Sequence, residues 1–147
     1  MVNLVYVLIF GITMGCSAHS SCSRTGGELP LAPCPESPNC VSSINTKNKH
    51  FIEPLRYSAT RESAYLKLTT IIASQPRTRI VTEQANYIHA EFKSRVFGFV
   101  DDVEFYFPTD QSVIHVRSAS RTGYYDFGVN RRRIENIRKL INAGLMQ

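Results

Sequence analysis

The sequence predicts an α+β fold, a two-layer sandwich in which two helices pack on one face of an antiparallel sheet of about four strands. Three segments alternate apolar and polar residues with a period of two, as strands with one covered face do. Two other segments carry apolar residues at the three- and four-residue spacing of an amphipathic helix. The chain has 147 residues, 43% of them hydrophobic, which is enough for one modest core.

The first regular elements are predicted shortly after residue 50. Residues 51–55 indicate a short strand at an edge of the sheet, because the segment contains a proline. Ser58 or Thr60 can cap a helix that runs to about Ser74, and Pro76 ends it. The residues that form the apolar stripe of this helix are Ala64, Tyr65, Leu68, Ile71 and Ile72.

Four segments then predict the main strands, at residues 79–83, 87–93, 102–107 and 113–118. In the last three, one side of the strand is apolar and the other is polar, so we expect an antiparallel meander. Both helices should cover the apolar side and leave the opposite side polar and open. That polar side gathers His89, Glu91, Asp102, Glu104, His115 and Arg117.

A loop at 123–128 leads to a last helix from about Asn130 to Asn142, which Gly144 closes. Its apolar stripe consists of Ile134, Ile137, Leu140 and Ile141. The formal charge of +5 and the pI near 9.2 suit anionic partners. We interpret the cluster Arg131–Arg133 as a solvated helix face, and no nucleic acid is expected, because basic and aromatic residues are not interleaved as in known nucleic-acid modules.

The N-terminus indicates a cell-envelope protein. Residues 1–16 resemble a lipoprotein-type leader, with an apolar run too short for a membrane span and then Cys16, on which a lipid anchor would be attached. The alternatives are an ordinary signal cut near Ala18, giving a secreted or periplasmic protein, an uncleaved anchor, and a cytosolic chain. Residues 17–28 have the composition of a flexible tether, and the single domain, with a proline-rich N-terminal cap, occupies residues 29–147.

Cys34 and Cys40 enclose five residues, two of which are prolines. This short, stiff loop predicts a disulfide in an oxidising compartment and leaves Cys22 free if Cys16 is lipidated. A metal-binding cysteine pair is the weaker alternative, because no second close pair of cysteine or histidine occurs.

Five motifs, in order, resemble a bacterial and plastid family known only as a domain of unknown function, number 1499. The likeness spans roughly residues 29 to 142, and the motifs are residues 34–43, 87–91, 99–105, 114–121 and 123–131. Bacterial members of that family often look like lipoproteins, so the resemblance implies an anchor at Cys16. It implies no particular activity.

One candidate site lies at the end of the last strand and in the loop that follows it. Arginines, hydroxyls and aromatic rings there would suit an anionic small ligand or an envelope partner protein, and the N-terminus of the last helix would offer further donors. The residues of this candidate site are Arg117, Ser118, Ser120, Arg121, Tyr124 and Asp126. The alternative is a structural loop in which Asp126 pairs with an arginine.

The polar side of the sheet offers an alternative function, a metal-dependent hydrolase that uses His89, Glu91, Glu104 and His115. We favour ordinary cross-strand charge pairs, such as Glu104 with Arg117, because solvated strand faces commonly look like this. A triad of Ser42 or Ser43 with a histidine and an aspartate lacks a nucleophile elbow. We therefore expect binding without catalysis and without a cofactor.

Overall fold

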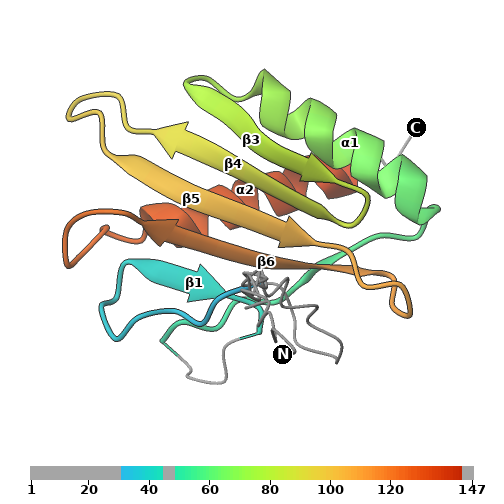
Figure 1. Ribbon diagram of the computed structural model, residues 1–147, viewed down its shortest axis with the longest axis horizontal. Helices are drawn as coiled ribbons and strands as arrows, with labels where there is room; N and C mark the ends of the chain where they lie inside the picture. Colours follow the sequence, from blue (N-terminus) through green and yellow to red (C-terminus); the bar gives the residue numbers. More distant parts are fainter. Residues whose placement is uncertain (1–30, 45–48, 144–147) are drawn as a thin grey trace, which may run out of the picture.

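The computed structural model of this chain describes residues 31–44 and 49–143, which fold into two layers (Figure 1). The predicted leader and tether, with Cys16 and Cys22, lie outside the described residues. The strands are β1 (Cys40–Ser42), β2 (Leu55–Arg56), β3 (Thr78–Gln84), β4 (Tyr87–Lys93), β5 (Val100–Tyr106) and β6 (Val113–Ser120). The helices are α1 (Arg61–Ser74) and α2 (Val129–Ala143). Within these described ranges, no helix is long and apolar enough to cross a membrane.

All strand pairs named in the sheet are antiparallel, in the order β1-β6-β5-β4-β3, with β2 also paired to β6. In Figure 1, α2 passes behind the sheet and α1 runs beside β3. Apolar residues of both helices share one core with the sheet, so the α+β class is as predicted. The prediction of about four strands is wrong, because the sheet has six. The strand β1 was not predicted, because three residues are too few to show a period of two. The short strand predicted at 51–55 corresponds to β2, which has only two residues and overlaps the prediction at Leu55.

Helix α1 begins as the sequence predicts. Thr60 is its N-cap and accepts a hydrogen bond from the backbone N–H of Ser63 at 3.2 Å. Because this cap satisfies an N–H that the first turn leaves without a partner, the start of the helix is encoded locally. Ala64, Leu68 and Ile72 are buried, which confirms the predicted stripe.

The core fills the space between the helices and the apolar side of the sheet. Its largest fully buried side chains include Phe105, Phe107, Leu68, Ile88, Ile114, Ile134 and Ile137. Ile141 continues the buried stripe of α2, whereas Leu140 is 43% exposed. The prediction for Leu140 is therefore wrong. The buried stripe of α2 is therefore one residue narrower than the sequence indicated, and its closest packing is against β6, α1 and β1.

The cap of the domain is joined to β6. Cys34 and Cys40 form the predicted disulfide, with Cα atoms 5.7 Å apart. Cys40 pairs with Ala119 across β1 and β6, and both residues are buried. The carbonyl of Asn39 accepts a hydrogen bond from the backbone N–H of Ser120 at 3.0 Å. The disulfide therefore holds the cap against the end of β6 from which the predicted binding loop leaves.

Candidate functional site

The side of the sheet that faces away from the helices, here called the reverse face, is a lattice of ion pairs. At its centre, Glu104 accepts hydrogen bonds from Nη1 of Arg117 at 2.7 Å and from the hydroxyl of Tyr87 at 2.8 Å. The side chains of Arg117 and Glu104 are only 16% and 14% exposed. The predicted pair of Glu104 with Arg117 is confirmed, so the charge of Arg117 is already balanced within the domain.

A second part of the lattice surrounds Arg121. Its guanidinium donates to both carboxylate oxygens of Asp102, each at 2.8 Å, and also to Glu91. Asp102 accepts a further contact from Nε2 of His89 at 2.7 Å, and Glu91 is also paired with Arg79 at 2.9 Å. Hydrogen bonding to Arg121 lowers the pKa of Asp102, and hydrogen bonding to Arg79 and then Arg121 lowers that of Glu91. The same contacts raise the pKa of Arg121 itself.

The residues proposed as metal ligands do not converge. His89 faces Asp102, Glu91 faces two arginines, and Glu104 faces Arg117 and Tyr87. In the part of the chain that the structure describes, no group of three or more histidine, cysteine or acidic side chains could hold a metal ion. The geometry therefore gives no support to the hydrolase alternative, which required these four side chains to meet.

His115 lies apart from the ion pairs and contacts Ser43, with Nδ1 3.1 Å from the serine Oγ. Burial lowers the pKa of His115, so this imidazole favours its neutral form. The hydroxyl of Ser43 is also bonded to the backbone N–H of Val116 at 2.9 Å and is buried. No aspartate or glutamate of the described ranges contacts this histidine, so Ser43 and His115 do not form a triad.

The six residues of the predicted loop site are divided between the two faces of the sheet. Arg117 and Arg121 belong to the reverse face. Ser118, Ser120 and Asp126 lie on the helix side, where they meet Asn130, and Tyr124 is 74% exposed. The division follows from the strand period, which turns successive side chains to opposite faces.

The N-terminus of α2 is occupied by the chain itself. The carboxylate of Asp126 accepts hydrogen bonds from the backbone N–H groups of Gly128 and Asn130 at 2.9 and 2.8 Å. These backbone N–H groups at the start of α2 are the donors that we expected an external anion to use. Asp126 therefore caps the helix instead of pairing with an arginine.

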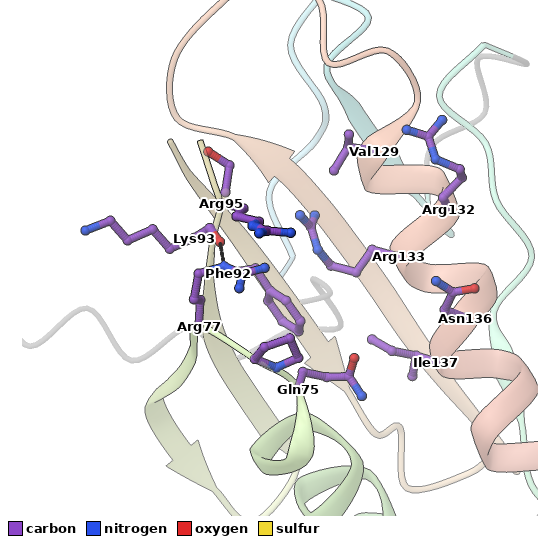
Figure 2. Close-up of a pocket in the computed structure, with 12 residues that line it drawn as sticks. Gln75, Arg77, Phe92, Lys93, Arg95, Val129, Arg132, Arg133, Asn136 and Ile137 are labelled. Carbon is purple, nitrogen blue, oxygen red and sulfur yellow. Dashed lines mark hydrogen bonds between the residues drawn. The ribbon is translucent and has the colours of Figure 1, made fainter. Parts of the chain in front are cut away.

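A strongly cationic hollow lies elsewhere, between the end of α1, the ends of β3 and β4, and the first turns of α2 (Figure 2). We call this hollow of about 400 Å³ the basic groove. Its cationic residues are Arg77, Lys93, Arg95, Arg132 and Arg133. Arg95 and Arg133 point into the groove from opposite walls, whereas Lys93 extends away from it (Figure 2).

Backbone geometry and packing hold two of these arginines in place. Arg77 has a positive φ of 57°, which is uncommon for a residue other than glycine. Its backbone carbonyl accepts from the N–H of Lys93 at 3.0 Å, and its Nε donates to the carbonyl of Lys93 at 3.3 Å. Arg133 lies over the ring of Phe92, 4.9 Å from its centroid, and is paired with Asp101.

The basic groove has an unbalanced positive charge. None of the described residues that line it is acidic, and among the five cations only Arg133 is paired with a carboxylate in the described ranges. Arg95 is exposed and makes no ion pair or hydrogen bond with the described chain. The groove is therefore the place where an external anion would neutralise charge rather than compete with an internal partner.

The basic groove could not be predicted while Arg131–Arg133 were interpreted as one solvated helix face. Consecutive residues of a helix point about 100° apart, so the three arginines diverge. Arg131 donates to the carbonyl of Phe51 at 2.8 Å, Arg132 is exposed, and the Arg133 side chain is 13% exposed. The interpretation is wrong for Arg131 and Arg133. The only signal available was the clustering of the cations Arg77, Lys93 and Arg95 at strand ends.

The described residues form a small two-layer α+β domain that has a disulfide in its N-terminal cap and carries the basic groove. The chain belongs to the family described as Protein of unknown function (DUF1499), whose family model matches residues 30–141. The resemblance seen in the five motifs is thereby confirmed. No curated protein matches the sequence.

Proposed function

We propose that this domain is a non-catalytic binding module that takes up an anionic ligand in the basic groove. The observation that carries the proposal is the set of arginines that line one hollow: Arg77, Arg95 and Arg132 have no acidic partner in the described residues. Lys93 also lines the hollow but extends away from it (Figure 2). The ligand is anionic, as the sequence predicts. We place it in the basic groove rather than on the reverse face and its adjoining loop. On the reverse face, Arg117 and Arg121 already have carboxylate partners.

The chemistry of the groove supports binding rather than catalysis. Guanidinium groups present several N–H donors in a plane that matches the oxygens of a phosphate or carboxylate. The described lining contains no histidine, cysteine, aspartate or glutamate, so it supplies no imidazole, carboxylate or thiol for acid–base or nucleophilic chemistry. Its single lysine, Lys93, extends away from the groove (Figure 2). A ligand with a phosphate group therefore suits the groove best.

Titration calorimetry of the full chain with inorganic pyrophosphate tests the proposal. We expect saturable binding that weakens about ten-fold in Arg95→Gln, because a hydrogen bond to a charged group contributes roughly 1.5 kcal/mol or more. Arg95 makes no hydrogen bond or ion pair with the described chain, so this substitution should leave the thermal unfolding temperature unchanged. Arg77→Gln should also weaken binding.

Arg56→Gln is the matched control. Arg56 is exposed on β2, far from the groove in sequence and in the sheet, and its substitution changes the net charge equally. Equal weakening in Arg56→Gln and Arg95→Gln would show that pyrophosphate responds only to net charge, and the proposal would fail. Absence of saturable binding would also reject it.

The location of the module is a separate proposal that rests on the sequence alone. We propose that the chain is anchored in the envelope through a lipid on Cys16, with the domain facing the periplasm. Incorporation of radiolabelled palmitate in cells, lost in Cys16→Ala, is the expected result. A soluble chain without label would instead favour the secreted alternative.

A further inference from the structure

A second hollow adjoins the basic groove at the same end of the sheet. We call this hollow of about 340 Å³ the aromatic groove. It lies between the β4–β5 loop (residues 94–99) and the β6–α2 loop (residues 121–128), which leave the sheet at the same end (Figure 1). Its apolar lining comprises Val96, Phe97, Phe99, Tyr125, Phe127 and Val129. Ser94, Arg95 and Val129 line both grooves, so the two hollows share a wall.

The rings of the aromatic groove are unusually exposed for a folded domain. Phe97 and Phe127 are 75% and 77% exposed, and Tyr125 is 58% exposed. Phe97 stacks on Phe99 with centroids 5.5 Å apart, and Tyr125 meets Phe127 edge to face at 5.1 Å. A contiguous apolar surface of this kind is characteristic of an interaction site, because water solvates it poorly.

The loop that carries Phe127 is held in its exposed position. Phe127 has a positive φ of 53°, a conformation that is unfavourable for a bulky aromatic residue. Its carbonyl accepts a hydrogen bond from Nη1 of Arg132 at 2.7 Å, and Asp126 caps the adjoining helix. The same contacts therefore connect a cation of the basic groove to the most exposed ring of the aromatic groove.

We propose that this end of the domain docks on the surface of an anionic lipid bilayer, with Phe97, Tyr125 and Phe127 at the boundary of headgroups and acyl chains. The inference rests on the proposed function, because it names lipid headgroup phosphates as the anion in the basic groove. Both loops lie at one end of the sheet, so both can reach one flat surface together (Figure 1).

Charge complementarity favours a lipid surface as the occupant. Aromatic rings beside Arg and Lys are the residues that proteins place at the membrane–water boundary, where cations contact anionic headgroups. Two carboxylates line the aromatic groove, but Asp101 is paired with Arg133 and Asp126 caps α2. Neither therefore presents an unbalanced negative charge to an anionic bilayer.

The chain contains no tryptophan, so the fluorescence of a single introduced tryptophan reports on the surroundings of that residue alone. Phe97→Trp puts the reporter in the aromatic groove, and Leu66→Trp puts it on α1, where Leu66 is 67% exposed. Full-length variants are mixed with vesicles of equal phosphatidylglycerol and phosphatidylcholine. We expect a blue shift of emission, and quenching by brominated acyl chains, for Phe97→Trp and neither for Leu66→Trp.

Both reporters carry the same N-terminal apolar run, so the difference between them measures the loop alone. In the Phe97→Trp background, Arg95→Gln should weaken vesicle binding about five-fold, the effect of removing one cation near an anionic surface. Phe127→Ala should weaken vesicle binding roughly ten-fold, because the variant lacks the apolar ring whose transfer from water into the bilayer favours binding. Vesicles of phosphatidylcholine alone should give weaker binding.

Three results would overturn the inference: equal signals from the two reporters, no change on either vesicle type, or equal binding to both vesicle types. If pyrophosphate still binds the basic groove in an Arg95-dependent manner, the proposed function stands and only the bilayer is excluded. If pyrophosphate binding also fails, both proposals fail.

Discussion

Asp126 and Asn130 are joined twice: the Asp126 carboxylate accepts from the backbone N–H of Asn130 at 2.8 Å and from its Nδ2 at 2.9 Å. Asn130 is fully buried and also donates to the carbonyl of Asn39 and to the hydroxyl of Ser120, each at 3.0 Å. One buried amide thus connects helix α2, strand β6, the cap and the loop that carries Tyr125 and Phe127. Asp126 lines the aromatic groove, and the first turns of α2, where Asn130 lies, border the basic groove.

Replacing Asp126 by Ala should lower the free energy of unfolding by about 1–2 kcal/mol, because α2 loses its N-terminal cap. Urea unfolding monitored by circular dichroism measures the change. Asp110→Ala is the control, since Asp110 lies in the exposed turn before β6 and makes no hydrogen bond or ion pair with the described chain. Equal stability of the two variants would show that the cap contributes nothing.

Removing the disulfide by Cys34→Ser together with Cys40→Ser should lower stability by about 2 kcal/mol, the chain-entropy value for so short a loop. Thermal unfolding with and without reductant measures the effect. Reductant should destabilise the unaltered protein and leave the double variant unchanged. Thiol labelling should reveal two additional reactive groups after reduction, and a smaller number would contradict the Cys34–Cys40 bond.

The ion pairs between arginines and carboxylates on the reverse face should make the free energy of unfolding depend on pH. The folded pKa values of Asp102 and Glu91 lie below their ordinary values. Their contribution is therefore complete above the unfolded values, near pH 4, and is lost as the pH falls through the folded ones. Arg121→Gln should flatten the loss of stability below about pH 4, whereas Arg56→Gln should not. Urea midpoints at several acidic pH values provide the measurement, and parallel curves would refute the explanation.

Tyr87 should produce the opposite dependence at high pH. Burial, and then the hydrogen bond to Glu104, raise the pKa of the Tyr87 phenol above its ordinary value of 10.0. A raised pKa contributes stability that is complete below pH 10 and is lost as the pH rises towards the folded value. Tyr87→Phe should lower stability at neutral pH and reduce the further loss above pH 10. A loss of the same size in both proteins would contradict this role.

Local patterns identified several features correctly. The helix from Thr60 to Ser74 and the strand from Tyr87 to Lys93 depend on caps and periodicity within a few residues, so the sequence predicts them well. The pair Cys34 and Cys40 is close enough in the chain for its spacing to be informative. The same alternation also placed Glu104 and Arg117 on one face, and their contact followed from it.

Contacts distant in sequence could not be predicted in this way. Strand β1 forms by pairing with β6, for example Cys40 with Ala119. A segment of three residues is too short for its sequence to predict such a pairing. Ser118 and Arg121 are near neighbours in sequence, yet they belong to opposite faces of the sheet. The predicted loop site was therefore divided by the strand geometry on which the fold prediction itself relied.

By itself, the sequence determined the two helices, the main strands, their apolar side and the disulfide, because each depends on the order of neighbouring residues. Only the tertiary structure decided which charges remain available. Arg77 and Arg95 come together from two separate loops beside α2 and have no carboxylate partner in the described residues, while the arginines of the reverse face are paired with carboxylates on adjacent strands. Charge balance depends on distances through space, and those distances exist only after the chain has folded.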